Sequence, residues 1–225
     1  MSAPARLAQS VRRHGVRDTA RRSAAHVTSP LRRVDTSQIW YHLRLDDHGR
    51  PRRELDPEFL LRKGSQDDAV LFEDLPTDPA VNKPTPELIA SRATQGAQLW
   101  VVVDGDRAAF CCWTFATAAP IWGAKGNLAL PPDIALLEDS YSSPHVRGRG
   151  VAPGAWTKIA DTLQGDGFRA MITKVDVRNQ PSRRAVEKAG FREIGVMRIQ
   201  GRLGVRRIRV EAEEDGRFLR TLERG

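Results

Sequence analysis

Cysteine is scarce in this chain, and long apolar runs are absent from it. The two cysteines, Cys111 and Cys112, are adjacent, and disulfide geometry rarely lets neighbouring residues bridge each other. They show no CxxC or Cys/His spacing, so we expect neither a disulfide framework nor a zinc site. No run of about 18 apolar residues occurs, which argues against a membrane-spanning helix. We therefore expect a cytoplasmic protein with no bound metal and no membrane span.

Acidic residues are scarce in the first 40 positions, which hold eight arginines and two aspartates. This segment therefore carries +6 of the formal net charge of +8 for all 225 residues. Such a composition is typical of a basic helical extension, an organellar presequence, or an arm that binds nucleic acid or an anionic membrane surface. We favour a basic extension over residues 1–52. Residues 1–38 contain no aromatic side chain, which disfavours nucleic-acid binding by base stacking.

The remaining residues, 53–225, alternate between strand and helix patterns and predict a mixed α/β domain. Within the basic extension, alternating apolar residues also indicate a strand at 39–45. Apolar runs predict further strands at 59–61, 99–103, 107–115, 134–137, 171–177, 194–199 and 205–212.

Capping residues mark where several helices begin. Ser65 is followed three residues later by an acid, Thr85 is followed directly by proline, and Asn179 precedes a proline by two positions. Another helix is predicted over residues 152–163, where apolar side chains recur at helical spacing. Asp104-Gly105, between two β-rich runs, predicts a tight hairpin.

A glycine-rich turn leads into the helix at 152–163, with the sequence Arg147-Gly148-Arg149-Gly150-Val151-Ala152. Glycine lets backbone N–H groups approach a ligand, and the start of a helix carries partial positive charge. Together they favour a phosphate or pyrophosphate site, to which Arg147 and Arg149 can add hydrogen bonds. The alternative is an ordinary tight turn with exposed arginines. A dinucleotide fingerprint fits less well, because Pro153 stands at its third glycine.

This hexapeptide resembles the Arg/Gln-x-x-Gly-x-Gly/Ala signature of the GNAT superfamily of acyl-CoA-dependent N-acyltransferases. Pro144 precedes the signature by three residues, and Asn179-x-x-Ser182 follows it after a helix and a strand, with Gly190-Phe191 beyond. The resemblance is clear over residues 134–200 and extends by element order from about residue 57. It implies a central, mostly antiparallel, splayed sheet flanked by helices.

The resemblance also implies transfer of an acyl group, usually acetyl, from its CoA thioester to an amine. The partners are then acetyl-CoA and an acceptor amine that the sequence does not name. In such folds the pyrophosphate lies on the loop N–H groups, and the pantetheine follows the strand before the loop. By resemblance, the cofactor contacts are Ser140, Tyr141, Ser142, Arg147, Gly148, Arg149, Gly150, Val151, Ala152, Asn179 and Ser182.

Glu138 is the candidate catalytic base. An alkyl amine near pKa 10.4 is protonated at pH 7, and reaching its neutral form costs about 4–5 kcal/mol, so a proton acceptor is needed. Glu138 shares strand parity with Ser140 and Ser142 if the strand has no bulge, and Asp139 then points the other way. A bulge would exchange the two acids. A surface carboxylate at the end of a strand is the alternative interpretation.

The acid that protonates the leaving thiolate is less conventional. Many relatives carry a tyrosine seven residues after the asparagine, but that position is Val186 in this chain. Ser182 is the substitute we favour, with Tyr141 as the second candidate. A serine that merely occupies the first turn of a helix is the alternative for Ser182.

Two other functions and the acceptor site stay open at this point. The missing tyrosine is compatible with an acyl-CoA-binding protein that does not catalyse transfer, and the basic arm with a module associated with nucleic acid. We expect the acceptor between the helices at 66–96, the loop at 116–133 and the final hairpin. Trp113 and Trp122 are candidates to line that cleft, although core packing explains them equally well. The sequence does not fix the oligomeric state, and a homodimer is compatible with it.

Overall fold

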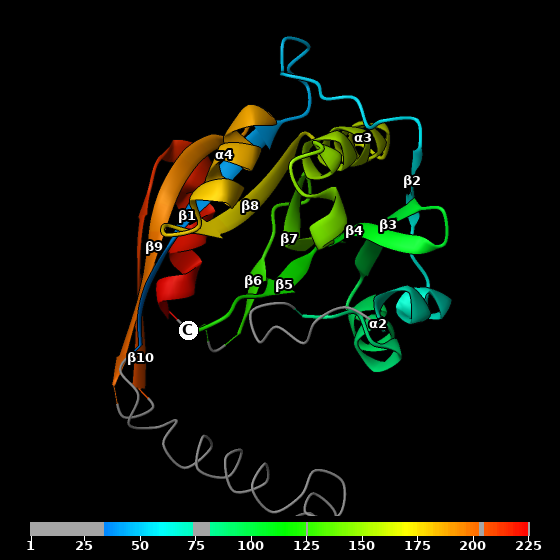
Figure 1. The fold of residues 1–225 in the computed structure, drawn as a ribbon. Coiled ribbons are helices and arrows are strands. Elements are labelled where there is room, and N and C mark those ends of the chain that lie inside the picture. Colours follow the sequence, from blue (N-terminus) through cyan, green and yellow to red (C-terminus); the bar gives the residue numbers. More distant parts are fainter. Residues whose placement is uncertain (1–33, 74–81, 125, 203–204, 225) are drawn as a thin grey trace, which may run out of the picture.

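The computed structural model describes residues 34–73, 82–124, 126–202 and 205–224. Eight strands form one sheet in the order β10-β9-β1-β8-β7-β4-β3-β2, with β7 and β8 as its parallel pair (Figure 1). The predicted mixed α/β fold with a mostly antiparallel sheet is confirmed. The strands are β1 (Val34–Arg44), β2 (Phe59–Lys63), β3 (Ala97–Asp104), β4 (Arg107–Phe115), β7 (Ile134–Ser142), β8 (Ala170–Asp176), β9 (Arg192–Arg202) and β10 (Val205–Ala212).

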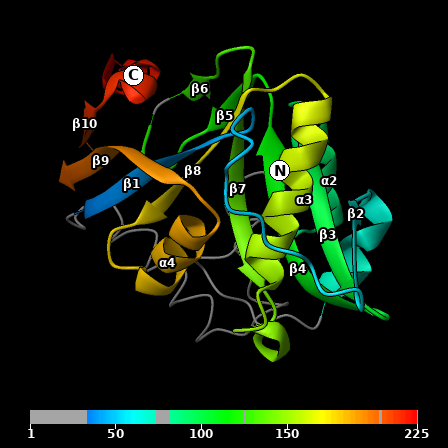
Figure 2. The ribbon, with the colours of Figure 1, turned by 90° about the horizontal axis from the view of Figure 1, so that it is seen from above.

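Helices cover both faces of the sheet, as Figure 2 shows from above. One face packs against α3 (Val151–Gly165) and α4 (Gln180–Lys188). The other packs against α2 (Pro86–Ala93), two 3₁₀ helices, and a small hairpin within the predicted loop at 116–133. These last elements are η2 (Gln66–Phe72), η4 (Glu214–Arg224), β5 (Ala118–Pro120) and β6 (Asn127–Ala129). Among the described residues, no helix has both the length and the apolar character needed to cross a membrane.

The predicted caps begin the helices on both faces. The Thr85 hydroxyl accepts a hydrogen bond from the Leu88 N–H at 3.2 Å, and α2 starts at the next residue. The Asn179 side chain accepts one from the Ser182 N–H at 3.2 Å and starts α4. The helix predicted after Ser65 is present as the 3₁₀ helix η2. The Thr85 and Asn179 side chains each satisfy a donor that the helix itself leaves unpaired.

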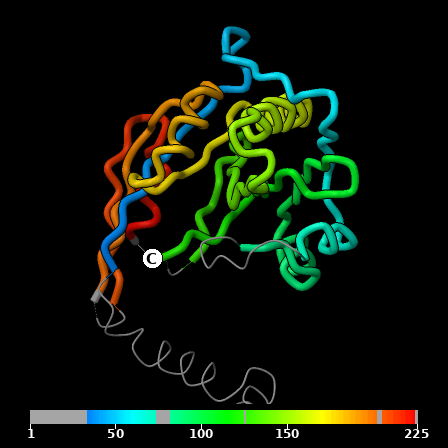
Figure 3. The backbone as a smooth tube through the Cα atoms, in the orientation of Figure 1, coloured from blue at the N-terminus to red at the C-terminus, as the bar shows by residue number. Residues whose placement is uncertain are grey.

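β1 lies in the middle of the sheet, between β8 and β9, although it comes first along the described chain. Figure 3 shows this early segment in blue beside the orange segment. Its alternation places Ile39 and Tyr41 in the core beneath α3 and α4, and Trp40 on the opposite face. The strand predicted within the basic extension therefore belongs to the same sheet as the strands that follow residue 52. The predicted arm over residues 1–33 lies outside the described residues.

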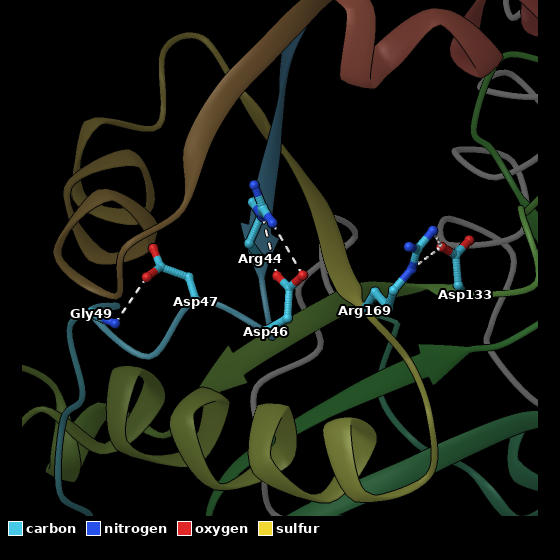
Figure 4. A network of polar contacts seen from close by, with 6 residues as sticks. All are labelled: Arg44, Asp46, Asp47, Gly49, Asp133 and Arg169. Atoms are coloured by element: carbon cyan, nitrogen blue, oxygen red, sulfur yellow. Dashed lines mark hydrogen bonds and ion pairs between the residues drawn. The ribbon is translucent and has the colours of Figure 1, made fainter.

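Ion pairs lie at the end of the sheet at which β7 and β8 begin. The Arg169 guanidinium donates to Asp133 Oδ2 at 2.8 and 2.6 Å (Figure 4). The Arg169 N–H also donates to the Asp133 carbonyl at 2.9 Å. Nearby, Arg44 at the end of β1 pairs with Asp46 at 3.1 Å. Exposed pairs add little stability, and the Asp133–Arg169 pair joins the residues that directly precede β7 and β8.

Candidate active site

The parallel ladder between β7 and β8 ends before either strand does. Paired positions run from Ile134 and Ala170 to Leu137 and Thr173. Beyond them β7 keeps β4 as its neighbour and β8 keeps β1, so the two strands diverge (Figure 2). We call the gap between the diverging parts of these two strands the β7–β8 opening. The edge of β7 that faces it presents backbone groups that no described strand pairs.

A bulge in β7 decides which side chains face each side of the opening. On β4, Cys111 is opposite Tyr141 and Trp113 is opposite Glu138, so β7 has one residue more than β4 over this stretch. Asp139 lies within the bulge and has a φ of 50°, the left-handed region that few residues other than glycine adopt. An extra residue reverses the alternation of the strand beyond it.

The prediction that Glu138 shares a face with Ser140 and Ser142 is therefore wrong. The Ser140 hydroxyl lies on the α3 side, where it accepts a hydrogen bond from Trp156 Nε1 at 3.3 Å. Glu138 lies on the opposite face, where its carboxylate pairs with Lys174. The bulge, which the parity argument assumed absent, is the physical reason.

Glu138 and Lys174 are the first residues beyond the ladder on β7 and β8, and their ion pair spans the opening. Their side chains are only 13% and 7% exposed. Burial raises the pKa of the Glu138 carboxyl, and the Lys174 ammonium opposes that rise. A carboxyl with a raised pKa is better matched to accepting a proton near neutral pH. Sequence reasoning missed Lys174, although a lysine within an otherwise apolar strand was a usable signal.

Asp139 contacts the same face of the sheet as Glu138, contrary to the predicted alternation. It accepts hydrogen bonds from Arg92 Nη2 at 2.5 Å and from Asn82 Nδ2 at 3.0 Å. The Arg92 guanidinium lies over the Trp113 ring, 4.7 Å from its centroid. Asp139 is thus paired with a buried arginine. The Asp139 charge raises the pKa of Glu138, and the Arg92 charge opposes that rise.

The predicted anion loop joins β7 to α3 and has the expected shape. Gly148 and Gly150 have φ values of 83° and 75°, and a Cβ on either would meet no atom within 4 Å. The Gly154 N–H donates to the Gly150 carbonyl at 3.0 Å, which closes the first turn of α3. N–H groups before this bond have no partner within a helix. The loop therefore presents donors and a positive helix end to open space, which suits a pyrophosphate.

The two loop arginines differ in their surroundings. Arg149 pairs with Glu58, and its guanidinium carbon lies 4.8 Å from the centroid of the Phe59 ring. Arg147 is exposed, and its Nε donates to the Ser142 carbonyl at 3.4 Å. Among the residues that the structure describes, no acid pairs with Arg147, whereas the charge of Arg149 is balanced by Glu58. Phosphate contacts by either arginine stay a prediction.

Residues 69–191, more than half of the chain, match the family model described as the acetyltransferase (GNAT) family. The chain belongs to the GNAT family. The match contains the β7–β8 opening, the anion loop and α4. It does not contain β1, β9 or β10, although β1 and β9 complete the sheet beside β8. No curated protein matches the sequence.

Solved structures share this GNAT fold at low sequence identity. A GNAT-family protein from Novosphingobium aromaticivorans has a TM-score of 0.52 and 17% identity, over 74% of this chain and 64% of its own. A Drosophila protein has a TM-score of 0.52 and 12% identity, over 80% and 56%. A conserved protein from Staphylococcus epidermidis has a TM-score of 0.50 and 9% identity, over 77% and 64%. The chain spans less than two thirds of each of these structures.

In this GNAT protein, α4 carries no tyrosine toward the opening. Asn179 and Ser182 are joined by the cap of α4, and Ser182 is half-buried. Val186, at the usual tyrosine position, is buried in the core beneath α3 and α4. The phenol that does contact α4 belongs to Tyr41 of β1, whose oxygen accepts from Arg183 Nε at 3.3 Å. Contacts of Asn179 and Ser182 with a cofactor stay a prediction.

The two thiols lie in β4 and are unsuited to nucleophilic chemistry. Burial raises the pKa of the Cys111 thiol to about 12 and that of Cys112 well above its ordinary value. A thiol at such a pKa carries almost no thiolate at neutral pH. Within the described residues, no group of three or more histidine, cysteine or acidic side chains could hold a metal ion.

Proposed function

We propose that this GNAT protein transfers an acetyl group from acetyl-CoA to an amine. The observation that carries the proposal is the β7–β8 opening next to the first turn of α3. The notable loop donors are the N–H groups from Arg149 to Ala152, of which the Arg149 N–H already donates to the Val146 carbonyl at 3.2 Å. A pyrophosphate on the N–H groups of Gly150 to Ala152 would place the cofactor beside the unpaired edge of β7. Backbone donors on that edge suit both an amide-containing pantetheine arm and the charge that develops on the thioester oxygen. Ser140 and Ser142 lie on this part of β7.

The reaction forms an amide C–N bond and breaks the thioester C–S bond. The attacking amine loses one proton, and the CoA thiolate that leaves gains one. We assign the acceptance of that proton to Glu138, because it is buried at the opening and its pKa is raised by burial. Ser182, at the start of α4, is the proposed donor to the thiolate. Tyr141 is the second candidate, on the far side of the bulge from Glu138.

Acetyl-CoA turnover against a panel of amines, measured by release of the CoA thiol, tests this function. The panel contains amino acids, amino-acid amides, polyamines and amino sugars. CoA binding, measured by titration calorimetry, is a separate readout. Turnover of any amine supports the proposal. Binding without turnover of any panel member would favour the non-catalytic alternative, and absence of CoA binding would reject the assignment of the loop.

The pH profile should report the Glu138 carboxyl. Its pKa is raised, so kcat/KM is expected to rise with pH along an acid limb that lies above the ordinary glutamate range. The Lys174 ammonium favours the ionised carboxylate, so Lys174→Met should move this limb to still higher pH. Lys158→Met, an exposed change on α3, is the control and should leave the limb in place. An identical limb in all three proteins would show that another group accepts the proton.

Deletion of residues 1–33 is expected to leave turnover of a small acceptor within about tenfold, or about 1.4 kcal/mol of barrier. Every proposed site residue lies after this segment. The deletion stops at residue 33 because Val34 to Ser37 pair with β9. Complete loss of activity in a folded truncation would mean that the arm forms part of the site. Salt-sensitive binding of nucleic acid that is lost with the arm would instead support the nucleic-acid alternative.

A further inference from the structure

The face of the sheet away from α3 and α4 carries a row of four large side chains across the β7–β8 opening. Strand pairing places Trp113 beside Glu138 and Lys174 beside Trp40, and the Glu138–Lys174 ion pair joins the two halves. Arg92 of α2 lies over Trp113. We call these five residues the acceptor-face cluster. Both tryptophans are at most 1% exposed, and Arg92 is 8% exposed.

Three hydrogen-bond donors of this cluster have no partner within the part of the chain that the structure describes. They are Trp40 Nε1, Trp113 Nε1 and Arg92 Nη1. An unpaired buried donor costs about 1–3 kcal/mol, and such groups are rare in native proteins. Three of them on one face, beside the proposed site of transfer, indicate a ligand that supplies hydrogen-bond acceptors.

The charges of the cluster narrow the chemistry of that ligand. Arg92 is paired with Asp139, and Lys174 with Glu138, so the four buried charges sum to zero. A dianion such as a phosphate monoester would add charge that no described group here balances, which is costly in a buried site. A molecule with one ammonium and one carboxylate adds no net charge. Its carboxylate has the planar form that a guanidinium recognises best.

We propose that the acceptor is an amine that also carries a carboxylate, such as an amino acid or a short peptide. The Arg92 Nη1 and Trp113 Nε1 donors bind the carboxylate, and Glu138 receives the proton of the amine. Arg92 is held for this role by Asp139 on Nη2, at 2.5 Å, and by the Trp113 ring beneath it. Trp40 Nε1 is a further donor on the other side of the opening. This inference rests on the proposed acetyl transfer.

The test compares L-amino acids with their amides as acceptors of acetyl-CoA. The amine of an amide is the less protonated of the pair at pH 7, so chemistry alone favours the amide. The wild-type protein is nevertheless expected to show a kcat/KM at least about tenfold higher for the acid, the effect of one charged hydrogen bond. Trp113→Phe removes a donor but keeps a ring, and should lower kcat/KM for the acid about tenfold.

The variants separate carboxylate recognition from a structural role. Arg92→Met should lower kcat/KM for the acid about 100-fold, the effect of losing a buried charged partner. In both variants kcat/KM should fall further for the acid than for the amide, so that the acid-to-amide ratio drops, while the KM for acetyl-CoA stays within about twofold. Arg44→Met, at an exposed arginine that also pairs with an aspartate, is the matched control and should leave the acid-to-amide ratio unchanged. Equal losses for acid and amide in a folded Trp113→Phe protein would overturn the inference.

Measurements on the wild-type protein distinguish failure of the carboxylate site from failure of the proposed acetyl transfer. Turnover of amides or plain amines as good as that of the acids would reject the carboxylate site and leave acetyl transfer standing. Absence of both CoA binding and turnover would reject the proposed function itself, and the carboxylate site with it. Preference for the acids that disappears in Trp113→Phe and Arg92→Met supports both.

Discussion

Gly150→Glu is expected to weaken CoA binding at least about 100-fold, or about 2.7 kcal/mol, while the protein stays folded. Gly150 directly precedes α3 and has a φ of 75°. A side chain there extends into open space, because an added Cβ would meet no atom within 4 Å. The new carboxylate therefore occupies the place proposed for the pyrophosphate, and the two negative charges repel each other. Titration calorimetry with CoA measures the loss.

Gly150→Gln is the matched control for this variant. Glutamine has the length of glutamate and imposes the same left-handed strain, about 1–2 kcal/mol, but it carries no charge. The glutamine variant should lose less affinity than the glutamate variant, and the difference isolates the electrostatic repulsion. Both should unfold at similar temperatures. Wild-type affinity for CoA in a folded Gly150→Glu protein would show that the pyrophosphate binds elsewhere.

Local signals predicted several elements of the fold. The caps at Thr85 and Asn179 begin α2 and α4 at the expected residues, and Asp104-Gly105 joins β3 to β4. These features depend on neighbours in sequence, so short-range physics decides them. Gly148 and Gly150, before α3, are also local signals, because glycine readily adopts the left-handed backbone found at both positions.

The place of β1 in the sheet could not be predicted from the same signals. Alternation at residues 39–45 indicated a strand, and the structure extends it to Val34–Arg44. Periodicity tells which side chains share a face, but it does not tell which strands are neighbours. Pairing with β8 and β9 depends on contacts between residues far apart in sequence. The resemblance is clear over residues 134–200 and extends by element order from about residue 57, so β1 lies outside it.

The bulge had the largest consequence for the site. Strict alternation put Glu138 with Ser140, and a single residue, Asp139, reverses that arrangement. A left-handed aspartate has no reliable sequence signal, since aspartate is enriched in that region but only a few per cent of non-glycine residues adopt it. The partners Lys174 and Arg92 were missed for a related reason. Each reaches its acid across the fold, from β8 and from α2.

Glu138→Gln is expected to reduce turnover by about 10²–10⁴-fold, the usual range for loss of a general base. The KM for acetyl-CoA should change little, because the carboxylate lies on the face opposite Ser140 and α3. The loss should shrink as the pH approaches the pKa of the amine, where the nucleophile is already neutral. Ser182→Ala should behave differently, since a defect in protonating the thiolate persists at high pH.

Glu138→Gln also removes the ion-pair partner of Lys174, and a double variant separates this effect from the loss of the base. Glu138→Gln leaves a buried lysine unpaired, which destabilises a protein by about 3–5 kcal/mol. Adding Lys174→Met removes the orphaned charge and should restore the free energy of unfolding, measured in urea, without restoring turnover. Asp139→Asn, which keeps a residue tolerant of the left-handed backbone, should cost far less activity than Glu138→Gln. Recovery of turnover in the double variant would show that the lysine, and not the missing base, caused the defect. Proton removal would then fall to solvent, with the fold supplying mainly the alignment of amine and thioester.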